Sequence, residues 1–330
     1  MTDASEPGGI ATRNSWAWIN ASWGNPEPYF RLRVRAMDEW HRLEQEVSDI
    51  HVAWVGGLFW ELPPEQLETF EVQHAAWGYG IRRVERAEVQ RIEPHLATPP
   101  EFALHVPAEG AVEPLAAAQA LLAAARGLGA MVIANTPVPS LNLYAGHVTG
   151  VETDTDRLDA DEVVVAGGVG TASLVATAGL TLPIIASAAL LVGTKPHSKR
   201  LNGLVMSPSM QLRQTAEGRL VAAAGFDDAD PDADVAVAAA ALFDAIKGMI
   251  ASGESLSPDF HVVGHRPIPK DGFPAVGRAD GIPGLYTAVM HSGITLAPAI
   301  GRFVADELLT GRRESLLEPY GLGRFHLKRG

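Results

Sequence analysis

The stretch that decides the fold runs from His265 to Gly311 and reads HRPIPKDGFPAVGRADGIPGLYTAVMHSGITLAPAIGRFVADELLTG. It predicts a strand that carries Arg266, a Lys-Asp-Gly turn, a further strand, and a loop at 291–295 that opens a helix near Leu296 or Pro298. Proline is tolerated in a first helical turn, because the N–H that it lacks has no intrahelical partner there. Backbone N–H groups at a helix start favour an anion or an electron-rich carbonyl, and an arginine holds a carboxylate with two parallel hydrogen bonds. The stretch therefore predicts a site for a ligand that carries negative charge.

The composition is that of a globular protein. The chain has 330 residues, of which 47% are hydrophobic and 20% charged, with a formal net charge of -13. Such a length allows a large core in one or two domains. The charge balance excludes a nucleic-acid footprint, and no run of about 18 apolar residues predicts a transmembrane helix. Because the start, MTDASEPGG, lacks the pattern of a secretory signal, we expect a cytoplasmic protein.

The side chains that commonly bind metals are not arranged for a metal site. There is no cysteine, which excludes disulfides, thiolate ligands and a cysteine nucleophile. His261 and His265 stand four residues apart at the end of a predicted strand, without the helical H-E-x-x-H context. The aspartate-rich run 227–234 lacks the central glycine and distal glutamate of a calcium loop. We interpret that run as a solvated loop that caps the next helix, and we predict no metal.

The middle of the chain predicts part of a nucleotide-binding domain. The pattern gives a helix at Glu113–Leu128 followed by strands at Met131–Ile133, Val138–Tyr144, Val148–Thr153 and Val163–Ala166. The last strand is short and fully apolar, as is expected inside a parallel sheet. The run Gly167-Gly168-Val169-Gly170-Thr171-Ala172 follows it but is not a dinucleotide fingerprint, because Ser173 replaces the last glycine and no acidic residue follows about 20 positions on. We interpret it as a glycine-lined strand end that packs closely against a neighbour.

The remaining elements suggest two domains that interleave along the chain. Residues 1–20 read as a loop, and helices are predicted at 28–46, 64–77, 86–92 and 235–250. Strands are predicted at 52–61, 102–106, 184–194, 204–207, 211–214, 220–223 and 260–263. All seven tryptophans lie between Trp16 and Trp77. They are interpreted as core and interface packing, with the alternative that Trp16 and Trp18 flank a planar ligand.

The C-terminal stretch and the VVVAGG segment resemble the FAD-dependent D-amino-acid oxidase superfamily, which includes glycine oxidase, sarcosine oxidase and the D-amino-acid dehydrogenases. The resemblance extends from Asp3 to about Gly311. It implies a mixed α/β (α+β) fold, in which an incomplete Rossmann-like FAD-binding domain is interleaved with an antiparallel-sheet substrate domain. The implied FAD-binding domain covers 1–50, 107–182 and 264–330, and the substrate-binding domain covers 51–106 and 183–263.

One part of the family pattern, the N-terminal G-x-G-x-x-G segment, does not precede Asp3. In the family this strand, turn and helix cradle the pyrophosphate of FAD, and about 30 residues would be needed for them. Asp3 matches the acidic position that binds the ribose, and Gly8–Ser15 match the loop that follows. We expect that the true start lies upstream of this one. A truncated non-catalytic paralogue that no longer retains flavin, or a chain completed by another polypeptide, are the alternatives.

The resemblance also implies roles for individual residues. Arg266 would pair with the substrate carboxylate and place the Cα–H over flavin N5, and His291 would reach the same substrate. N–H groups of the loop and helix start would stabilise the reduced flavin near N1, and the N-terminal loop would follow the other edge of the ring. The implied cofactor-binding residues are Asp3, Thr12, Arg13, Asn14, Ser15, Ala17, Trp18, Val138, Ala166, Gly167, Gly293, Ile294, Thr295 and Leu296. With no cysteine available for a tether, the FAD is predicted to be held non-covalently.

The implied activity is oxidation of the C–N bond of a small amino or N-alkyl amino acid by hydride transfer to flavin N5. The cofactor performs the difficult step, and the protein supplies position and charge stabilisation. The electron acceptor, oxygen or a quinone, and the particular amino acid are left open by the sequence, as is the oligomeric state. Taken alone, Arg266 also fits a structural arginine and Val138 an ordinary core residue.

Overall fold

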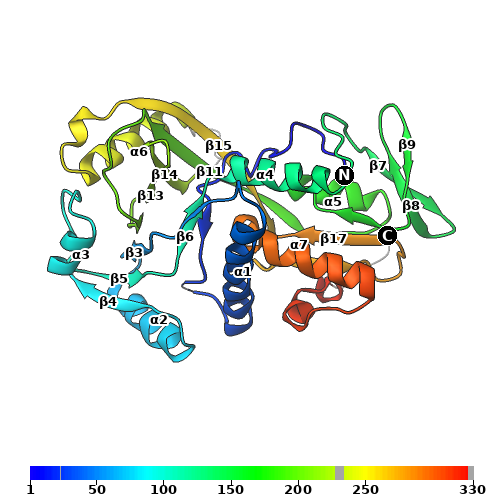
Figure 1. Ribbon diagram of the computed structural model, residues 1–330, viewed down its shortest axis with the longest axis horizontal. Coiled ribbons are helices and arrows are strands. Elements are labelled where there is room, and N and C mark those ends of the chain that lie inside the picture. Colours follow the sequence, from blue (N-terminus) through cyan, green and yellow to red (C-terminus); the bar gives the residue numbers. More distant parts are fainter. Residues whose placement is uncertain (23, 227–233, 326–330) are drawn as a thin grey trace.

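The computed structural model describes residues 1–22, 24–226 and 234–325. Figure 1 shows an elongated molecule with a large sheet and helix α6 (Val235–Met249) at one end. Helices α4 (Pro114–Gly127) and α7 (Gly293–Thr310) extend from the middle of the molecule toward the other end, and helix α1 (Glu27–Glu46) stands near the middle. The helices within the described ranges are completed by α2 (Pro64–Ala76), α3 (Arg86–Ile92) and α5 (Thr171–Ala176), with 3-10 turns η1 (Gly168–Gly170), η2 (Gly253–Ser255), η3 (Ser315–Tyr320) and η4 (Leu322–Phe325).

The largest sheet has eight strands and is almost wholly antiparallel. Its order is β15 (Pro258–Pro269), β11 (Ile184–Thr194), β14 (Leu220–Gly225), β13 (Gln211–Gln214), β12 (Leu204–Met206), β3 (Gly57–Phe59), β5 (Phe102–Val106) and β4 (Arg82–Glu85). Only β12 and β3 run parallel among these neighbours. Helix α6 covers one face, with Leu242 and Ile246 buried against the strands. The long pair β11 and β15 leads from this sheet toward the other end of the molecule.

Three smaller sheets accompany the large one. They are β10 (Val163–Val165) with β17 (Leu285–Val289) and β16 (Ala275–Arg278); β1 (Trp18–Ile19) with β6 (Gly110–Val112) and β2 (Val52–Ala53); and β7 (Ser140–Tyr144) with β8 (His147–Glu152) and β9 (Arg157–Asp159). β10 pairs with β17 in parallel, as expected for a short apolar strand of that kind. The mixed α/β class predicted from the sequence is confirmed.

The predicted interleaving has a counterpart in the sheets. The eight-stranded sheet draws its strands from 57–106 and 184–269, two segments separated along the chain. Strand β15 crosses the predicted boundary between 263 and 264 without a break, and β2, β6 and β1 join residues on both sides of two other boundaries. The division into an FAD-binding and a substrate-binding domain stays a prediction.

Several predicted elements differ from the structure. The strand predicted at 52–61 is two strands in different sheets, because Gly56 turns the chain with a left-handed φ of 70°. Residues 131–133 form no strand, only a parallel bridge from Ile133 to Thr2. The loop predicted at 1–20 contains β1, and the strand predicted at 260–263 extends to Pro269 because β11 pairs along its whole length. These strand bounds are determined by pairing with distant strands rather than by the local sequence pattern.

The aspartate-rich run falls mostly outside the described residues, which resume at Asp234. Its carboxylate accepts hydrogen bonds from the N–H groups of Ala236 at 2.8 Å and Val237 at 3.2 Å. These N–H groups have no intrahelical partner, so Asp234 caps α6 as predicted.

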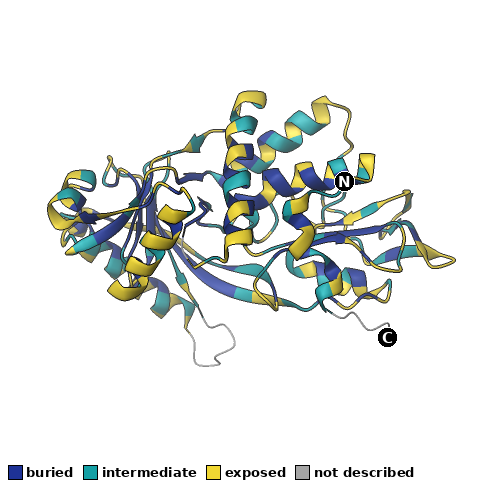
Figure 2. Cartoon of the chain, turned by 90° about the horizontal axis from the view of Figure 1, so that it is seen from below, coloured by how far each residue is buried: buried dark blue, intermediate teal, exposed yellow. Residues whose placement is uncertain are grey.

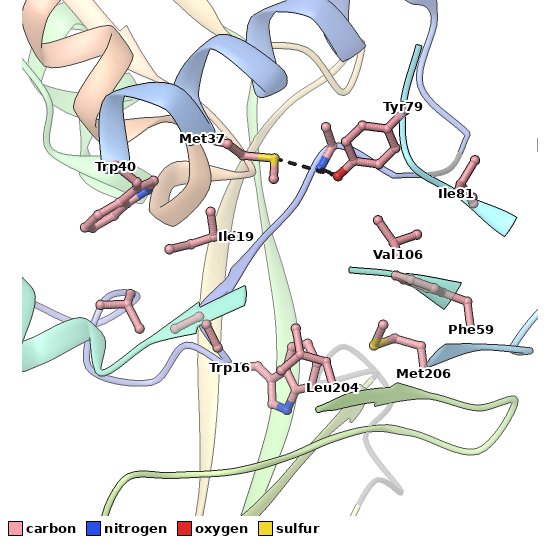
Figure 3. Close-up of a cluster of buried hydrophobic side chains, with 14 of the residues drawn as sticks. Trp16, Ile19, Met37, Trp40, Phe59, Tyr79, Ile81, Val106, Leu204 and Met206 are labelled. Carbon is pink, nitrogen blue, oxygen red and sulfur yellow. Dashed lines mark hydrogen bonds between the residues drawn. The ribbon is translucent and has the colours of Figure 1, made fainter. Parts of the chain in front are cut away.

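The largest core cluster joins the N-terminal loop and α1 to the eight-stranded sheet. Figure 3 shows Trp16 of the N-terminal loop, Ile19 of β1, and Met37 and Trp40 of α1 in this cluster. Facing them are Phe59, Tyr79, Ile81, Val106, Leu204 and Met206. Figure 2 shows burial along the whole molecule, with many buried residues in the strands and exposed residues on the outer helical faces. This packing fixes the loop and α1, both of which reach the candidate site.

Candidate functional site

A large cavity lies where the N-terminal loop, α1, β15 and the start of α7 meet. Its volume is about 1070 Å³. Ligand pockets are typically about 300–1,000 Å³, so this one is large enough for a bulky cofactor with a small substrate. Apolar side chains of α4, β10 and α7 also line it, among them Ala117, Leu121, Val164 and Val304.

Strand pairing places Arg266 in this cavity. Arg266 lies on β15 directly opposite Ser187 of β11. Its Nη2 donates to Ser187 Oγ at 2.9 Å and to Ala188 O at 3.3 Å, and its Nε donates to Ser187 O at 3.5 Å. Within the described part of the chain, Nη1 has no hydrogen-bond partner and the guanidinium has no carboxylate partner. Burial lowers the pKa of Arg266 from its usual value. Arg266 is thus held from one side, with free donors left for an anion.

The start of α7 is the second wall. The helix begins at Gly293 rather than near Leu296 or Pro298, because the Leu296 N–H already donates to Ser292 O at 3.0 Å. Pro298 therefore lies inside the helix and leaves the Ile294 carbonyl without its usual donor. Trp40 Nε1 takes that place, at 3.1 Å from Ile294 O and 3.2 Å from Thr295 O.

Not all the predicted amides of this helix are available to a ligand. The Gly293 N–H donates to His291 O at 2.8 Å, and the Leu296 N–H is used within the helix. No described residue accepts from the N–H groups of Ile294 and Thr295, which belong to the first turn. Leu296 is fully buried in the core and does not line the cavity. The positive end of the helix dipole, with these two N–H groups, favours negative charge at this wall.

The N-terminal loop forms the third wall and carries backbone strain. Ala17 has a left-handed φ of 63°, a conformation that L-residues rarely adopt and that is found at functional sites. Its N–H donates to Ser15 Oγ at 3.0 Å, and Thr295 Oγ1 donates to Trp18 O at 2.9 Å. The loop passes close to β15, because a Cβ at Gly264 would lie 2.9 Å from Asn14 O. Glycine at 264 therefore permits the contact between loop and strand.

Trp16 and Trp18 both line the cavity, and both indoles are also part of the packing. Trp16 Nε1 donates to Val221 O at 3.0 Å and Trp18 Nε1 to Glu109 Oε2 at 2.9 Å. Their rings meet edge to face, with centroids 6.0 Å apart. Packing is therefore established for both, and the flanking of a planar ligand stays a prediction.

His291 lines the cavity two residues before α7 begins. The ring is accessible from the cavity, yet enough protein surrounds it that burial, with the positive charges of Arg266 and Arg33, lowers its pKa to about 4. The imidazole is therefore neutral near pH 7. A neutral imidazole both donates and accepts a hydrogen bond, which suits contact with a polar substrate without adding a third positive charge.

The structure gathers most of the predicted site residues, but not all. Those that line the cavity are Thr12, Asn14, Ser15, Ala17, Trp18, Ala166, Arg266, His291, Gly293, Ile294 and Thr295. Asp3, Arg13, Val138, Gly167 and Leu296 do not line it. The Asp3 carboxylate accepts from Ser5 N at 3.0 Å, and the Asp3 backbone pairs with Ile133 and Thr136, two to five residues before Val138. Asp3 is thus paired with the segment that leads to Val138, and neither residue lines the cavity. The predicted contact of Asp3 and Val138 with the adenosine of FAD stays a prediction.

Sequence reasoning missed Arg33, Asn20 and Ser292. Arg33 of α1 is 6% exposed and donates to Asn20 O at 3.0 Å, to Ser292 Oγ at 2.6 Å and to Asn20 Oδ1. The signal was present in the sequence, because Arg33 occupies the buried stripe of α1 with Phe30, Met37 and Trp40. Val34, predicted for that stripe, is only partly buried.

The architecture matches that of solved enzymes. The crystal structure of glycine oxidase from Geobacillus kaustophilus superposes with a TM-score of 0.86 at 23% identity, over 97% of this chain and 90% of that one. The "Uncharacterized oxidoreductase YurR" of Bacillus subtilis (strain 168) is 29% identical over 327 residues, which are 94% of this chain and 85% of the relative. The glycine oxidase of Pseudomonas putida is 30% identical over 183 residues, 53% of this chain and about half (48%) of that relative.

The family model "FAD dependent oxidoreductase" (DAO) matches residues 1–307. This protein belongs to the DAO family of FAD-dependent oxidoreductases, which confirms the resemblance found in the sequence. Among the described residues, no helix is long and apolar enough to cross a membrane.

Proposed function

We propose that this protein is an FAD-dependent oxidoreductase that oxidises the C–N bond of a small amino or N-alkyl amino acid. The observation that carries the proposal is the position of Arg266. A half-buried guanidinium without a carboxylate partner among the described residues opens into a cavity that the first turn of α7 also lines. Buried cations are normally paired, so this one is suited to a ligand carboxylate.

The described residues fit the ring end of the cofactor. The Ile294 and Thr295 amides, the strained backbone at Ala17 and the side chains of Thr12 and Ser15 face a common space. Because the chain contains no cysteine, we propose that FAD is held non-covalently. When bound, it would supply the two-electron acceptor, with hydride arriving at N5 as the family resemblance implies.

The protein's own contribution is position and electrostatics. Arg266 would fix the substrate carboxylate with two hydrogen bonds, and thereby the direction of the Cα–H bond. His291, neutral near pH 7, would form a hydrogen bond with the amino group or the carboxylate of the substrate. Because it carries no charge, it would not compete with Arg266 for an ion pair with the carboxylate. The α7 amides would stabilise the negative charge that develops on reduction. The substrate loses two electrons and two protons, and water hydrolyses the resulting imine to a keto acid and an amine.

The test begins with the colour of the purified protein. Absorbance near ~450 nm that survives gel filtration, and bleaches without oxygen when an amino acid is added, is the expected result. An N-methyl amino acid should bleach it, and the matched amide, which lacks the carboxylate, should not. A colourless protein that stays colourless after FAD is added would favour the alternative of a non-catalytic paralogue that does not retain flavin. Reoxidation by oxygen or by a soluble quinone then identifies the acceptor.

A further inference from the structure

Arg33 is a buried cation without an anion. It is 6% exposed, and its three hydrogen-bonding contacts are all neutral: the carbonyl and side-chain oxygens of Asn20 and the hydroxyl of Ser292. A guanidinium has five donors, so two are left. Among the described residues no carboxylate lies within ion-pair distance of Arg33. Arginine is rarely buried without such a partner, because the desolvation of its charge is then poorly offset.

The cavity as a whole is positively charged. Among its lining residues in the described ranges, Arg33 and Arg266 are cationic, and no aspartate or glutamate is present. This contrasts with a chain whose formal net charge is -13. The buried Glu109 does not line the cavity, and its carboxylate is taken up by hydrogen bonds from the Ala21 and Ser22 N–H groups, the Tyr79 hydroxyl and Trp18 Nε1.

Both guanidinium groups act on the same space. Arg266 and Arg33 each add to the effect of burial in lowering the pKa of His291, so both face the surroundings of that ring. A further residue that lines the cavity, Tyr29, is almost fully buried, and its ring centroid lies 5.4 Å from the Arg33 guanidinium carbon. Its hydroxyl oxygen has no hydrogen-bond partner among the described residues. An unsatisfied buried hydroxyl on a neighbour of a buried unpaired cation indicates a polar ligand group at the Arg33 end of the cavity.

We propose that the substrate is a dicarboxylic amino acid, with its α-carboxylate on Arg266 and its second carboxylate on Arg33. The proposal rests on the proposed function, since it assumes that Arg266 holds the first carboxylate. It assigns Arg33 to substrate selection: a monocarboxylic amino acid leaves Arg33 buried and unpaired, whereas a dicarboxylic one neutralises both cations. The alternative role of Arg33, stabilising charge on the reduced cofactor, does not depend on the second carboxylate and is separated by the test.

The test compares two inert thioethers that differ by one carboxylate. Methylthioacetate and thiodiacetate are titrated by calorimetry into the FAD-loaded protein, the Arg33→Gln variant and the control Arg31→Gln. Arg31 is on the same helix but exposed, and its side chain pairs with Glu27. We expect the wild type to bind thiodiacetate about 10- to 100-fold more tightly, as one charge-assisted hydrogen-bonded contact provides. Arg33→Gln should abolish that preference and leave methylthioacetate binding unchanged, and Arg31→Gln should keep it.

Three results would overturn the proposal. If the wild type binds both thioethers equally, Arg33 does not bind a second carboxylate, and the proposed function is unaffected. An equal loss for both in Arg33→Gln assigns Arg33 to the cofactor or the fold. If neither binds, the carboxylate site at Arg266 is wrong, and the proposed function falls with it. The wild-type comparison needs no variant, so it decides the question even if Arg33→Gln fails to fold. D- and L-aspartate in place of the thioether then show whether the second carboxylate is carried on Cα or on nitrogen.

Discussion

Helix α1 carries two buried charges that the protein treats in opposite ways. Glu39 is 2% exposed and is surrounded by Arg35 at 2.6 Å, Arg42 at 2.5 Å and Arg302 at 2.9 Å. Arg33, also buried, has only neutral partners within the described ranges. Removing one member of a buried, well-paired set of charges destabilises the fold, whereas a buried charge without a partner is a cost that a ligand can remove. The comparison separates residues that hold the structure from residues that serve the site.

The largest effect is expected at the other cation of the cavity. Arg266→Lys keeps the charge but lacks the planar pair of donors, so kcat/KM for the amino-acid substrate should fall on the order of 100-fold. Flavin content should be unchanged, because the contacts proposed for the ring come from the N-terminal loop and α7. The control Arg278→Lys alters an arginine of β16 that pairs with Glu162 at 2.6 Å. An unaltered kcat/KM in Arg266→Lys would mean that Arg266 does not bind the substrate carboxylate.

Sequence reasoning found the features that lie within one continuous stretch and missed those that only the fold brings together. Several elements have the predicted bounds: α3, β5, β11 and β13. Arg266 and the loop at 291–295 were found because a strand, a turn and a helix start follow one another within 47 residues of one stretch. Arg33 was missed because it lies more than 230 residues earlier, where it reads as one of three alternating arginines on a helix.

The start of α7 shows the same limit. Local rules place Pro298 in a first turn, and only a tertiary contact, the indole of Trp40 on the Ile294 carbonyl, makes a proline inside the helix acceptable. The strands of two or three residues, β1 and β6, likewise exist through pairing with each other and with β2. Their sequences carry no period long enough to read.

Glu39→Gln should give the next largest effect, on stability. Burial alone would raise the pKa of Glu39, yet its hydrogen bonds with Arg42 and Arg302 and the charge of Arg35 hold it below its usual value. The contribution of the carboxylate to stability is therefore fully present above its unfolded pKa and is lost as the pH falls from that value through the lower folded pKa. At pH 7 the variant should lose roughly 1–3 kcal/mol of unfolding free energy, measured by urea titration.

The matched control on the same helix is Glu27→Gln. Its carboxylate is half exposed and pairs with the exposed Arg31, so the loss should stay under about 0.5 kcal/mol. Equal losses in the two variants would mean that the arginines around Glu39 contribute no more than a surface pair does.

The smallest effect is expected at His291, whose imidazole is kept uncharged near pH 7. Burial first, and then Arg266 and Arg33, lower the pKa of His291 to about 4. In the unfolded chain the ring binds its proton near the ordinary value of ~6.5, so between these two values the unfolded state takes up more protons and folding is weakened as the pH falls. Compared with His291→Gln, the wild type should lose extra stability from pH 6.5 to pH 4. Because the ring is open to the cavity, this loss should be under about 1 kcal/mol.

NMR titration of the imidazole C–H signals tests the cause of this shift directly. Arg266→Gln removes one of the two positive charges, so the midpoint of His291 should move upward, whereas Arg31→Gln should leave it in place. An unmoved midpoint in Arg266→Gln would mean that burial alone keeps the ring neutral, and that the two guanidiniums do not share the space around it. Thiodiacetate should act in the same direction as Arg266→Gln, since a dianion between the arginines offsets the charge that now repels the proton. A midpoint that rises with thiodiacetate but less with methylthioacetate would connect His291, Arg266 and Arg33 to one bound dicarboxylate.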